Sequence, residues 1–187
     1  HPEKVLAMTE RFAADHPEVP TPLVRAVLRA CQWCEEAGHR HELAKLLARP
    51  EFVAQPVELI EQSLSIDRQF GTSRAQRNAR PSGWQMKSFS AASTFPSKMH
   101  PVWMLQQMVR WGHLHPAADL ESIAERCCDT RPFRAAAAAL GIACPAEDFV
   151  PMELRHGRML TIEQVRAEAA KRGNSQKSRS AAALPAA

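Results

Sequence analysis

Prolines at the start of apolar, helix-period segments are the feature of this sequence that most restricts its fold. Proline has no backbone N–H, and the first helical turn is where that N–H is not needed. Pro22, Pro56, Pro101 and Pro132 each open a segment whose apolar residues recur every three or four positions. We therefore expect a series of short helices. They are predicted to begin near Pro2 (Val5, Met8, Thr9 and Phe12 on one face), at Thr21 as a cap before Pro22, and near residues 39, 56, 101, 117, 132 and 161. Gly38, Gly112 and Gly141 are predicted to end three of them. The last helix begins with a capping box over 161–164, and Leu160 with Val165 has the spacing of a hydrophobic staple.

The composition also favours helices over sheets. Aromatic residues make up 6% of the chain and Tyr is absent, whereas strands are rich in aromatic and β-branched residues. The longest apolar run, Ala135 to Cys144, is about half of the roughly 20 residues that a membrane-spanning helix needs. The chain begins at His1 rather than Met, and we expect it to be a piece of a longer protein.

Residues 65–100 interrupt the helical pattern. Gly71, Pro81, Gly83 and Pro96 break up a polar stretch with a possible short strand at 85–89. Irregular segments of this length in compact domains are usually functional, disordered or docked on another part of the protein. We expect one domain over 1–149 that contains this segment. An extension with a short helix should follow over 150–172 and a disordered tail over 173–187.

The sequence carries no motif of a known catalytic or cofactor site. It has no H-E-x-x-H, no G-x-S-x-G and no phosphate-binding glycine loop. His39 and His41, like His113 and His115, are two residues apart and cannot share a helix face. We therefore predict no enzyme activity, no cofactor and no metal.

Five cysteines, an odd number, fit reduced thiols better than a fully paired disulfide framework. Cys31 and Cys34 have C-x-x-C spacing but come late in a helical segment, where the helix dipole does not lower a thiol pKa. Cys127 and Cys128 could complete a zinc site, although adjacent cysteines rarely bind one ion. Core packing is the favoured interpretation, with metal binding and redox chemistry as the alternatives.

The net charge of +4 is concentrated in two places. Basic residues gather at Arg68, Arg74, Arg77, Arg80 and Lys87 in the irregular segment, and again in the tail. A nucleic-acid surface needs basic side chains on an ordered face, with aromatic partners for single strands. We interpret these charges as solvated and expect no direct nucleic-acid binding.

The segment from Phe95 to Gly112 joins the irregular stretch to a helix that is apolar nearly all round. One interpretation is a core helix with a Trp-rich face. The other is a helix that closes against a ligand-binding lobe, with Lys98 or His100 facing the cleft. A small anion needs positive charge or N–H donors, so Lys98 and His100 are the candidate ligand-binding residues.

The same segment resembles a known family. Phe95-Pro96, Trp103 and the run Gln107-Met-Val-Arg-Trp-Gly112 resemble the C-terminal signature of the nitrate/bicarbonate-binding protein family. Further stretches agree over about residues 1–149: His1 to Leu6 with His16-Pro17, Ala30 to Cys34, Leu46 to Phe52, and Arg134 to Ile142 with Pro145. Ser97-Lys98 replaces the family's usual aromatic–basic pair, and Cys127-Cys128-Asp129 stands where Tyr–Arg is common.

This resemblance implies the C-terminal part of a two-lobed, α/β periplasmic-binding-protein-like (type II) fold, mainly α as a fragment. It implies a periplasmic or envelope-associated solute-binding protein that delivers nitrate, nitrite or a similar small oxyanion to the membrane subunits of an ABC transporter. The alternative is a cytoplasmic nitrate sensor that sequesters an RNA-binding antiterminator. A third possibility is a free-standing helical interaction module, in which residues 1–187 would fold cooperatively alone.

Overall fold

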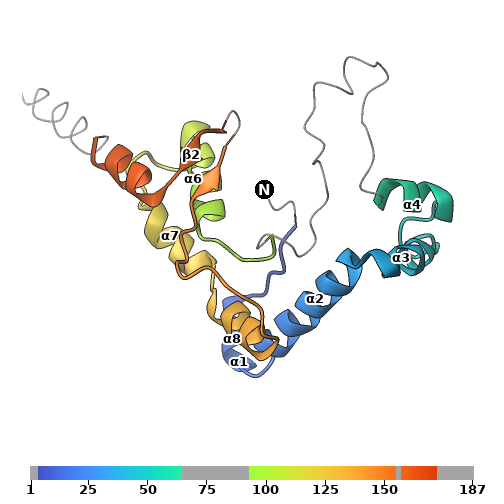
Figure 1. The fold of residues 1–187 in the computed structure, drawn as a ribbon. Helices are drawn as coiled ribbons and strands as arrows, with labels where there is room; N and C mark the ends of the chain where they lie inside the picture. The colour runs from blue at the N-terminus through green and yellow to red at the C-terminus, as the bar shows by residue number, and fades with distance from the viewer. Residues whose placement is uncertain (1–3, 65–92, 155–156, 172–187) are drawn as a thin grey trace, which may run out of the picture. The chain divides into compact units, whose positions relative to one another are not determined.

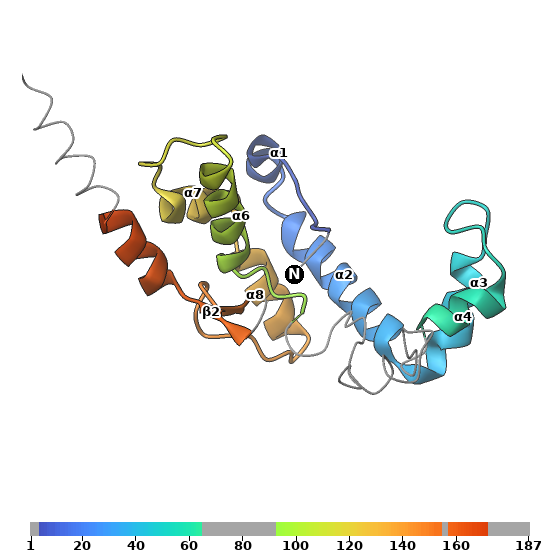
Figure 2. The same cartoon turned by 90° about the horizontal axis from the view of Figure 1, so that it is seen from above.

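The computed structural model describes residues 4–64, 93–154 and 157–171. The predicted strand at 85–89, most of the irregular segment and the tail at 173–187 lie outside these residues. The described part is mainly helical, as predicted (Figures 1 and 2). Its elements are α1 (Glu10–Asp15), α2 (Pro20–Glu35), a 3₁₀ turn (Ala37–His39), α3 (Arg40–Leu47), α4 (Val57–Leu64), α6 (Met99–Arg110), α7 (Leu120–Cys127), α8 (Arg131–Ala139), β1 (Met152–Glu153), β2 (Met159–Leu160) and a helix at 162–171. Each helix within residues 4–64, 93–154 and 157–171 is too short or too polar to span a bilayer.

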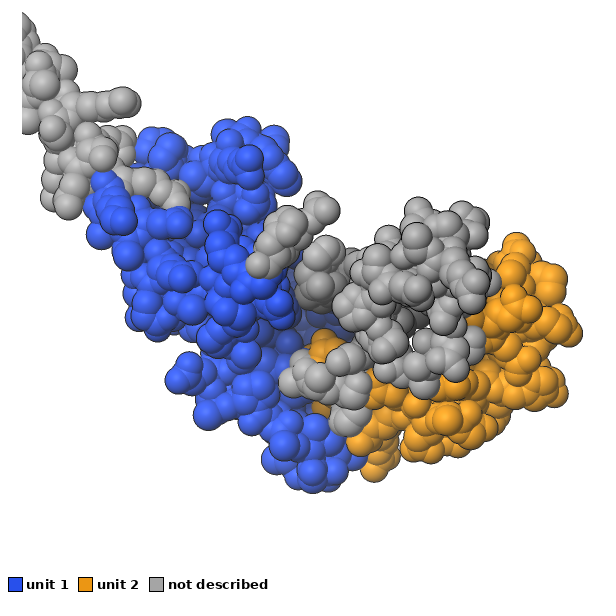
Figure 3. All heavy atoms as spheres, turned by 45° about the horizontal axis from the view of Figure 1, so that its top comes forward, with its two compact units in different colours: residues 1–21, 95–187 blue, residues 22–94 orange. Residues whose placement is uncertain are grey.

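The chain divides into two compact units (Figure 3). One comprises residues 1–21 and 95–187, and the other comprises residues 22–94. In the second unit α3 packs against α4, with Leu43, Ala44 and Ile60 buried. The His41 imidazole Nδ1 lies 2.6 Å from the Glu61 carboxylate Oε1 and links these two helices. Each unit therefore has its own packed helices.

Several helices begin at other residues than the proline pattern predicted. Residues 4–9 are not helical, so Pro2 does not open a helix that contains Val5 and Met8. Instead α1 begins after Thr9, which has an extended backbone. The Thr9 hydroxyl caps the helix by accepting the Phe12 N–H at 3.1 Å. The threonine cap stops the helix from extending further back.

Proline still marks the first turns of the next helices, but α2 and α6 start one or two residues earlier than expected. Helix α2 begins at Pro20, so Thr21 lies inside it and is not its cap. Helix α6 begins at Met99, which places Pro101 at its third position. Because the first turn has no internal acceptors for its N–H groups, each of these prolines fits without loss of a helical hydrogen bond.

Gly112 and Gly141 end two helices as predicted, whereas α2 already ends at Glu35 and Gly38 lies in the 3₁₀ turn that follows. Gly112 has a φ of 78°, and the N–H groups of Gly112 and His113 donate to the carbonyls of Val109 and Met108 at 3.1 and 2.8 Å. Gly141 ends α8 in the same way, with a φ of 66°. This is the Schellman arrangement, in which a residue with positive φ satisfies the last carbonyls of the helix.

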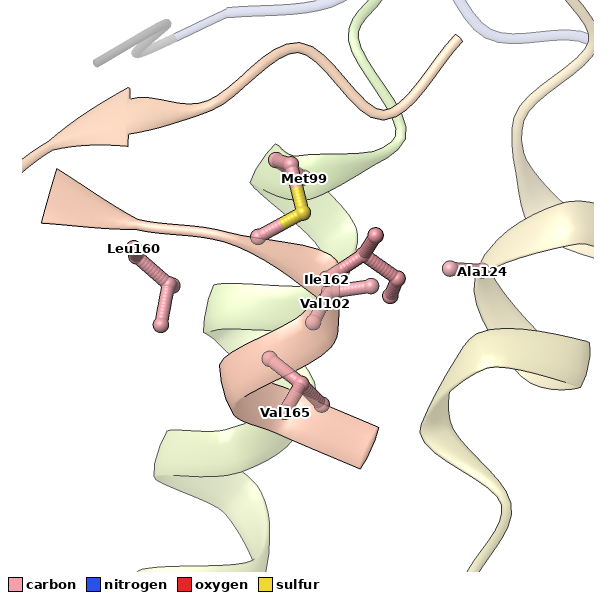
Figure 4. Close-up of a cluster of buried hydrophobic side chains, with 6 residues drawn as sticks. All are labelled: Met99, Val102, Ala124, Leu160, Ile162 and Val165. Carbon is pink, nitrogen blue, oxygen red and sulfur yellow. The ribbon is translucent and has the colours of Figure 1, made fainter. Parts of the chain in front are cut away.

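A hydrophobic cluster joins α6, α7 and the segment after residue 150 in the first unit (Figure 4). Helix α6 contributes Met99 and Val102, and α7, which packs against it, contributes Ala124. The remaining buried members are Leu160, Ile162 and Val165. The segment after residue 150 therefore supplies part of this core through a hairpin and a helix.

The local sequence around residue 160 explains that packing. Strands β1 and β2 pair antiparallel, with Met152 opposite Leu160. Thr161 and Gln164 form the predicted capping box: the Gln164 side chain accepts the Thr161 N–H at 3.2 Å, and the Thr161 hydroxyl accepts the Gln164 N–H at 3.4 Å. The box fixes the start of the helix at 162–171 so that Ile162 and Val165 point into the cluster.

The cysteines are less buried than predicted. All five are thiols; Cys127 is exposed, and the other four are half-buried. Cys31 and Cys34 lie in the last turns of α2, and partial burial raises the pKa of both thiols. Within the described residues, no group of three or more His, Cys, Asp or Glu side chains could hold a metal ion.

Candidate functional site

Lys98, the first predicted ligand-binding residue, forms an ion pair with the chain's own carboxylate. It immediately precedes α6, and its Nζ lies 3.0 Å from Oδ2 of Asp148. Only 15% of the Lys98 side chain is exposed. In this structure the positive charge of Lys98 is therefore directed at Asp148.

Two further side chains donate to the same carboxylate. Nη2 of Arg134 lies 2.7 Å from Asp148 Oδ1, and Nε lies 3.3 Å from it. The Thr130 hydroxyl lies 2.9 and 3.0 Å from the two carboxylate oxygens. We call Lys98, Thr130, Arg134 and Asp148 the Asp148 cluster. It joins the segment before α6, the start of α8 and the loop after α8.

Backbone contacts hold this arrangement in place. Arg134 also donates to the carbonyls of Pro145 at 2.6 Å and Ala146 at 3.3 Å. The Lys98 N–H donates to the Asp148 carbonyl at 2.9 Å. Because these bonds do not involve the carboxylate, the loop at 145–148 is fixed to α8 and to the start of α6 independently of it.

Aromatic rings line the cluster. The Arg134 guanidinium lies 5.2 Å from the centre of the Phe95 ring, and Lys98 Nζ lies 5.8 Å from the centre of the Phe149 ring. Phe95 in turn packs edge-on against Phe133 at 5.4 Å. Such cation–π contacts are stronger where water is partly excluded, so the rings help to orient both cations.

The cluster keeps Asp148 ionised. Partial burial raises the pKa of this carboxyl, but hydrogen bonds from Arg134, Lys98 and Thr130 outweigh burial and hold the pKa at about 2. Burial also raises the pKa of the neighbouring Cys128 thiol, which lies 3.2 Å from the Pro96 carbonyl. At neutral pH the cluster therefore combines two cations with one anion.

His100, the second predicted residue, lies in the first turn of α6 and is half-buried. Burial lowers the pKa of its imidazole, so the ring is mostly neutral at pH 7. It could offer a ligand a hydrogen bond but little positive charge. Of the two predicted residues, Lys98 belongs to the Asp148 cluster and His100 does not.

Helix α6 presents different faces to the core and to solvent. Val102 is fully buried, whereas Met104, Met108 and Trp111 are 43%, 38% and 66% exposed. These three residues are spaced at i, i+4 and i+7 and so form one apolar row. The helix therefore has a core face, but of the predicted Trp-rich face only Trp103 packs against the core, while Trp111 lies on an outer apolar face that the core does not cover.

Sequence reasoning did not identify Thr130, Arg134 and Asp148 as a cluster. Their spacing from Lys98 follows no local motif, because the four residues come from three segments. The only sequence signal was the Arg134 region, which contributed to the family resemblance. Asp148 stands 50 positions after Lys98 and gave no signal of its own.

Parts of the chain are similar in sequence to known proteins. Residues 1–48 match the NMT1-like family. The chain is 32% identical over 141 residues to the nitrate/nitrite binding protein NrtA of Synechococcus elongatus, covering 75% of this chain and 31% of the relative. It is 34% identical over 143 residues to the bicarbonate transport ATP-binding protein CmpC of the same species, covering 76% of this chain and 20% of the relative. The chain thus spans about a third or less of these relatives.

A solved structure shows the fold. The crystal structure of the periplasmic nitrate-binding protein NrtA from Synechocystis PCC 6803 matches with a TM-score of 0.69 and 24% sequence identity. The match covers 87% of this chain and 43% of that chain. The chain therefore has the fold of part of a periplasmic-binding-protein-like protein, which confirms the fold predicted from the resemblance.

Proposed function

Because the chain belongs to the nitrate/bicarbonate-binding protein family, we propose that it is the C-terminal part of a solute-binding protein for nitrate, nitrite or a similar small oxyanion. The observation that carries this proposal is the identity of 32% over 141 residues to a nitrate/nitrite binding protein. A binding role without catalysis accounts for the absence of catalytic motifs in the sequence. In this role two lobes close around the ion, and the ion favours the closed state because it binds that state more tightly.

The proposed partners are the membrane subunits of an ABC transporter, and the proposed location is the periplasm or the cell envelope. A relative named as a bicarbonate transport ATP-binding protein supports the link to ATP-driven transport. The solved structure of a protein named as periplasmic supports the location.

Lys98 and His100 remain the proposed ligand contacts within this chain. Lys98 has the charge that an oxyanion requires, and the neutral His100 ring offers a hydrogen bond. In the described conformation Lys98 is already paired with Asp148. An anion that contacts Lys98 therefore has to compete with that carboxylate.

Isothermal titration calorimetry on the full-length protein that contains this chain tests the proposal. Nitrate, nitrite and bicarbonate are titrated separately, with chloride as the control anion. Binding of at least one oxyanion, weakened at least about tenfold by Lys98→Ala, would support both the function and the site. No oxyanion binding at millimolar concentration would refute the function, and unchanged affinity in Lys98→Ala would refute the site.

The five thiols favour a second candidate, the cytoplasmic nitrate sensor that sequesters an antiterminator. Free thiols are more common in reducing compartments than in the periplasm. Exposed Cys127 allows a direct test by labelling intact cells with a thiol reagent that does not cross the inner membrane. Labelling that is reduced by Cys127→Ser would support the envelope location, whereas labelling only after lysis would support the sensor.

A further inference from the structure

The Asp148 carboxylate is bound as a ligand would be bound. Its donors come from three separate segments: Arg134 Nη2 at 2.7 Å from Oδ1, Lys98 Nζ at 3.0 Å from Oδ2, and the Thr130 hydroxyl at 2.9 and 3.0 Å from both. A carboxylate is a planar, singly charged group with trigonal geometry. Formate, nitrate, nitrite and bicarbonate share these properties, so the same donors fit them.

The donors are held by contacts other than the carboxylate. Arg134 is fixed by the Pro145 and Ala146 carbonyls, and its guanidinium lies against Phe95. Thr130 is only 4% exposed. The main chain at residue 148 is bonded to the Lys98 N–H at 2.9 Å. We therefore expect these donors to stay in place when the Asp148 side chain is shortened.

The charges also require an anion at this position. Lys98 and Arg134 bring two positive charges to one carboxylate, and Asp129 next to the cluster is paired with Arg131 at 2.8 Å. Without the Asp148 carboxylate, two partly buried cations would lack a direct counter-ion. Partly buried cations of this kind are costly unless they are paired.

We propose that Lys98, Thr130 and Arg134 form a site for a planar oxyanion, which the Asp148 carboxylate fills as an intramolecular ligand. A solute anion reaches Lys98 only when it displaces this carboxylate. This inference deepens the proposed function and rests on it for the identity of the natural solute. The donor site itself can be tested without that identity in the full-length protein that contains this chain, with formate as the probe.

The test compares Asp148→Ala with Glu121→Ala. The control also removes a carboxylate paired with an arginine, since Arg166 Nε lies 2.9 Å from Glu121 Oε2, but this pair has no lysine or threonine donor. Urea unfolding of the full-length protein is followed by tryptophan fluorescence in sodium formate and in sodium chloride at equal ionic strength. If formate binds Asp148→Ala with a Kd of about 1 mM, about 100 mM shifts its folding equilibrium roughly 100-fold.

The wild type and Glu121→Ala are expected to shift less than about twofold under the same conditions. Asp148→Asn keeps the volume of the side chain, blocks entry of an anion and should also fail to respond. A response to formate but not to chloride in Asp148→Ala alone supports the proposal. Equal responses in Asp148→Ala and Glu121→Ala, or an equal response to chloride, would overturn it.

A folding defect in Asp148→Ala does not prevent the test. In that case the variant is refolded by dialysis into formate or into chloride, and the recovered helical circular dichroism is compared. Recovery in formate alone supports the proposal, and no recovery in either overturns it. Oxyanion binding by the full-length wild type is a separate result, so failure of the inference and failure of the proposed function can be distinguished.

Discussion

Acid should weaken the first unit through protonation of Asp148, and Asp148→Asn should remove that part of the acid sensitivity. Three donors hold the pKa of this carboxyl at about 2, compared with 3.8 for an ordinary aspartate. The folded-state pKa is lower than the unfolded value. The contribution to stability is therefore complete above about pH 5 and is lost as the pH falls through about 4 to 2.

The size of this contribution follows from the two pKa values. At about 1.36 kcal/mol per pH unit, the difference between 3.8 and about 2 sets a ceiling of about 2.4 kcal/mol. The Asp148 side chain is 28% exposed, and solvent and salt screen the pair. We therefore expect about 1–2 kcal/mol of unfolding free energy from this group at neutral pH.

Urea unfolding at pH 6, 4, 3 and 2 measures the effect. At pH 6 Asp148→Asn should be less stable than the wild type by about 1–3 kcal/mol, because Lys98 and Arg134 lose their counter-ion. Near pH 2 the two proteins should converge, since about half of the wild-type carboxyls are then protonated. Glu121→Gln is the control, because the hydrogen bond from Arg166 also lowers the pKa of Glu121 but in a more exposed pair. A constant difference between wild type and Asp148→Asn from pH 6 to 2 would refute the reasoning.

Three further predictions concern the first unit and one control glycine, and all are measured as changes in unfolding free energy. Gly112→Ala should cost about 1 kcal/mol, because the φ of Gly112 is 78°. Gly38→Ala is the control and should not destabilise, since a Cβ at residue 38 meets nothing within 4 Å and the φ of Gly38 is not in the left-handed region. Equal losses in the two variants would contradict the backbone argument. Thr161→Ala should cost about 0.5–1 kcal/mol through loss of the capping box, and no loss would show that packing alone fixes this helix. Val102→Ala should cost about 2 kcal/mol or more, because the Val102 side chain is fully buried. Met104→Ala should cost much less, because Met104 is 43% exposed. A larger loss in Met104→Ala than in Val102→Ala would contradict the orientation of α6.

The helices were predictable because their signals are local. A proline in the first turn, a glycine with positive φ after the last turn and a capping box each act within about four residues. These signals located the ends of α6 and α8 and the start of the helix at 162–171. They misplaced the start of α1, because the Thr9 cap lies inside a continuous apolar pattern that the periodicity argument extended back to Pro2.

The contribution of the hairpin to the core was not predictable in the same way. Strands β1 and β2 have two residues each, which is too short for an alternating pattern to be recognised. Leu160 was identified as part of a helix start through its spacing from Val165. Its burial against Met99 and Val102 depends on contacts across about 60 residues of sequence, which no local signal encodes.

The candidate site shows the same division between local chemistry and distant partners. Lys98 was selected because a small oxyanion needs a cation, and in the structure Lys98 does contact a carboxylate. The predicted contact between Lys98 and a solute anion stays a prediction, and the sequence could not show that the partner within the chain is Asp148. A mostly buried lysine such as Lys98 is therefore compatible both with a structural ion pair and with ligand binding. What separates the two roles is whether the donors at Lys98, Thr130 and Arg134 still hold an anion when the Asp148 carboxylate is removed.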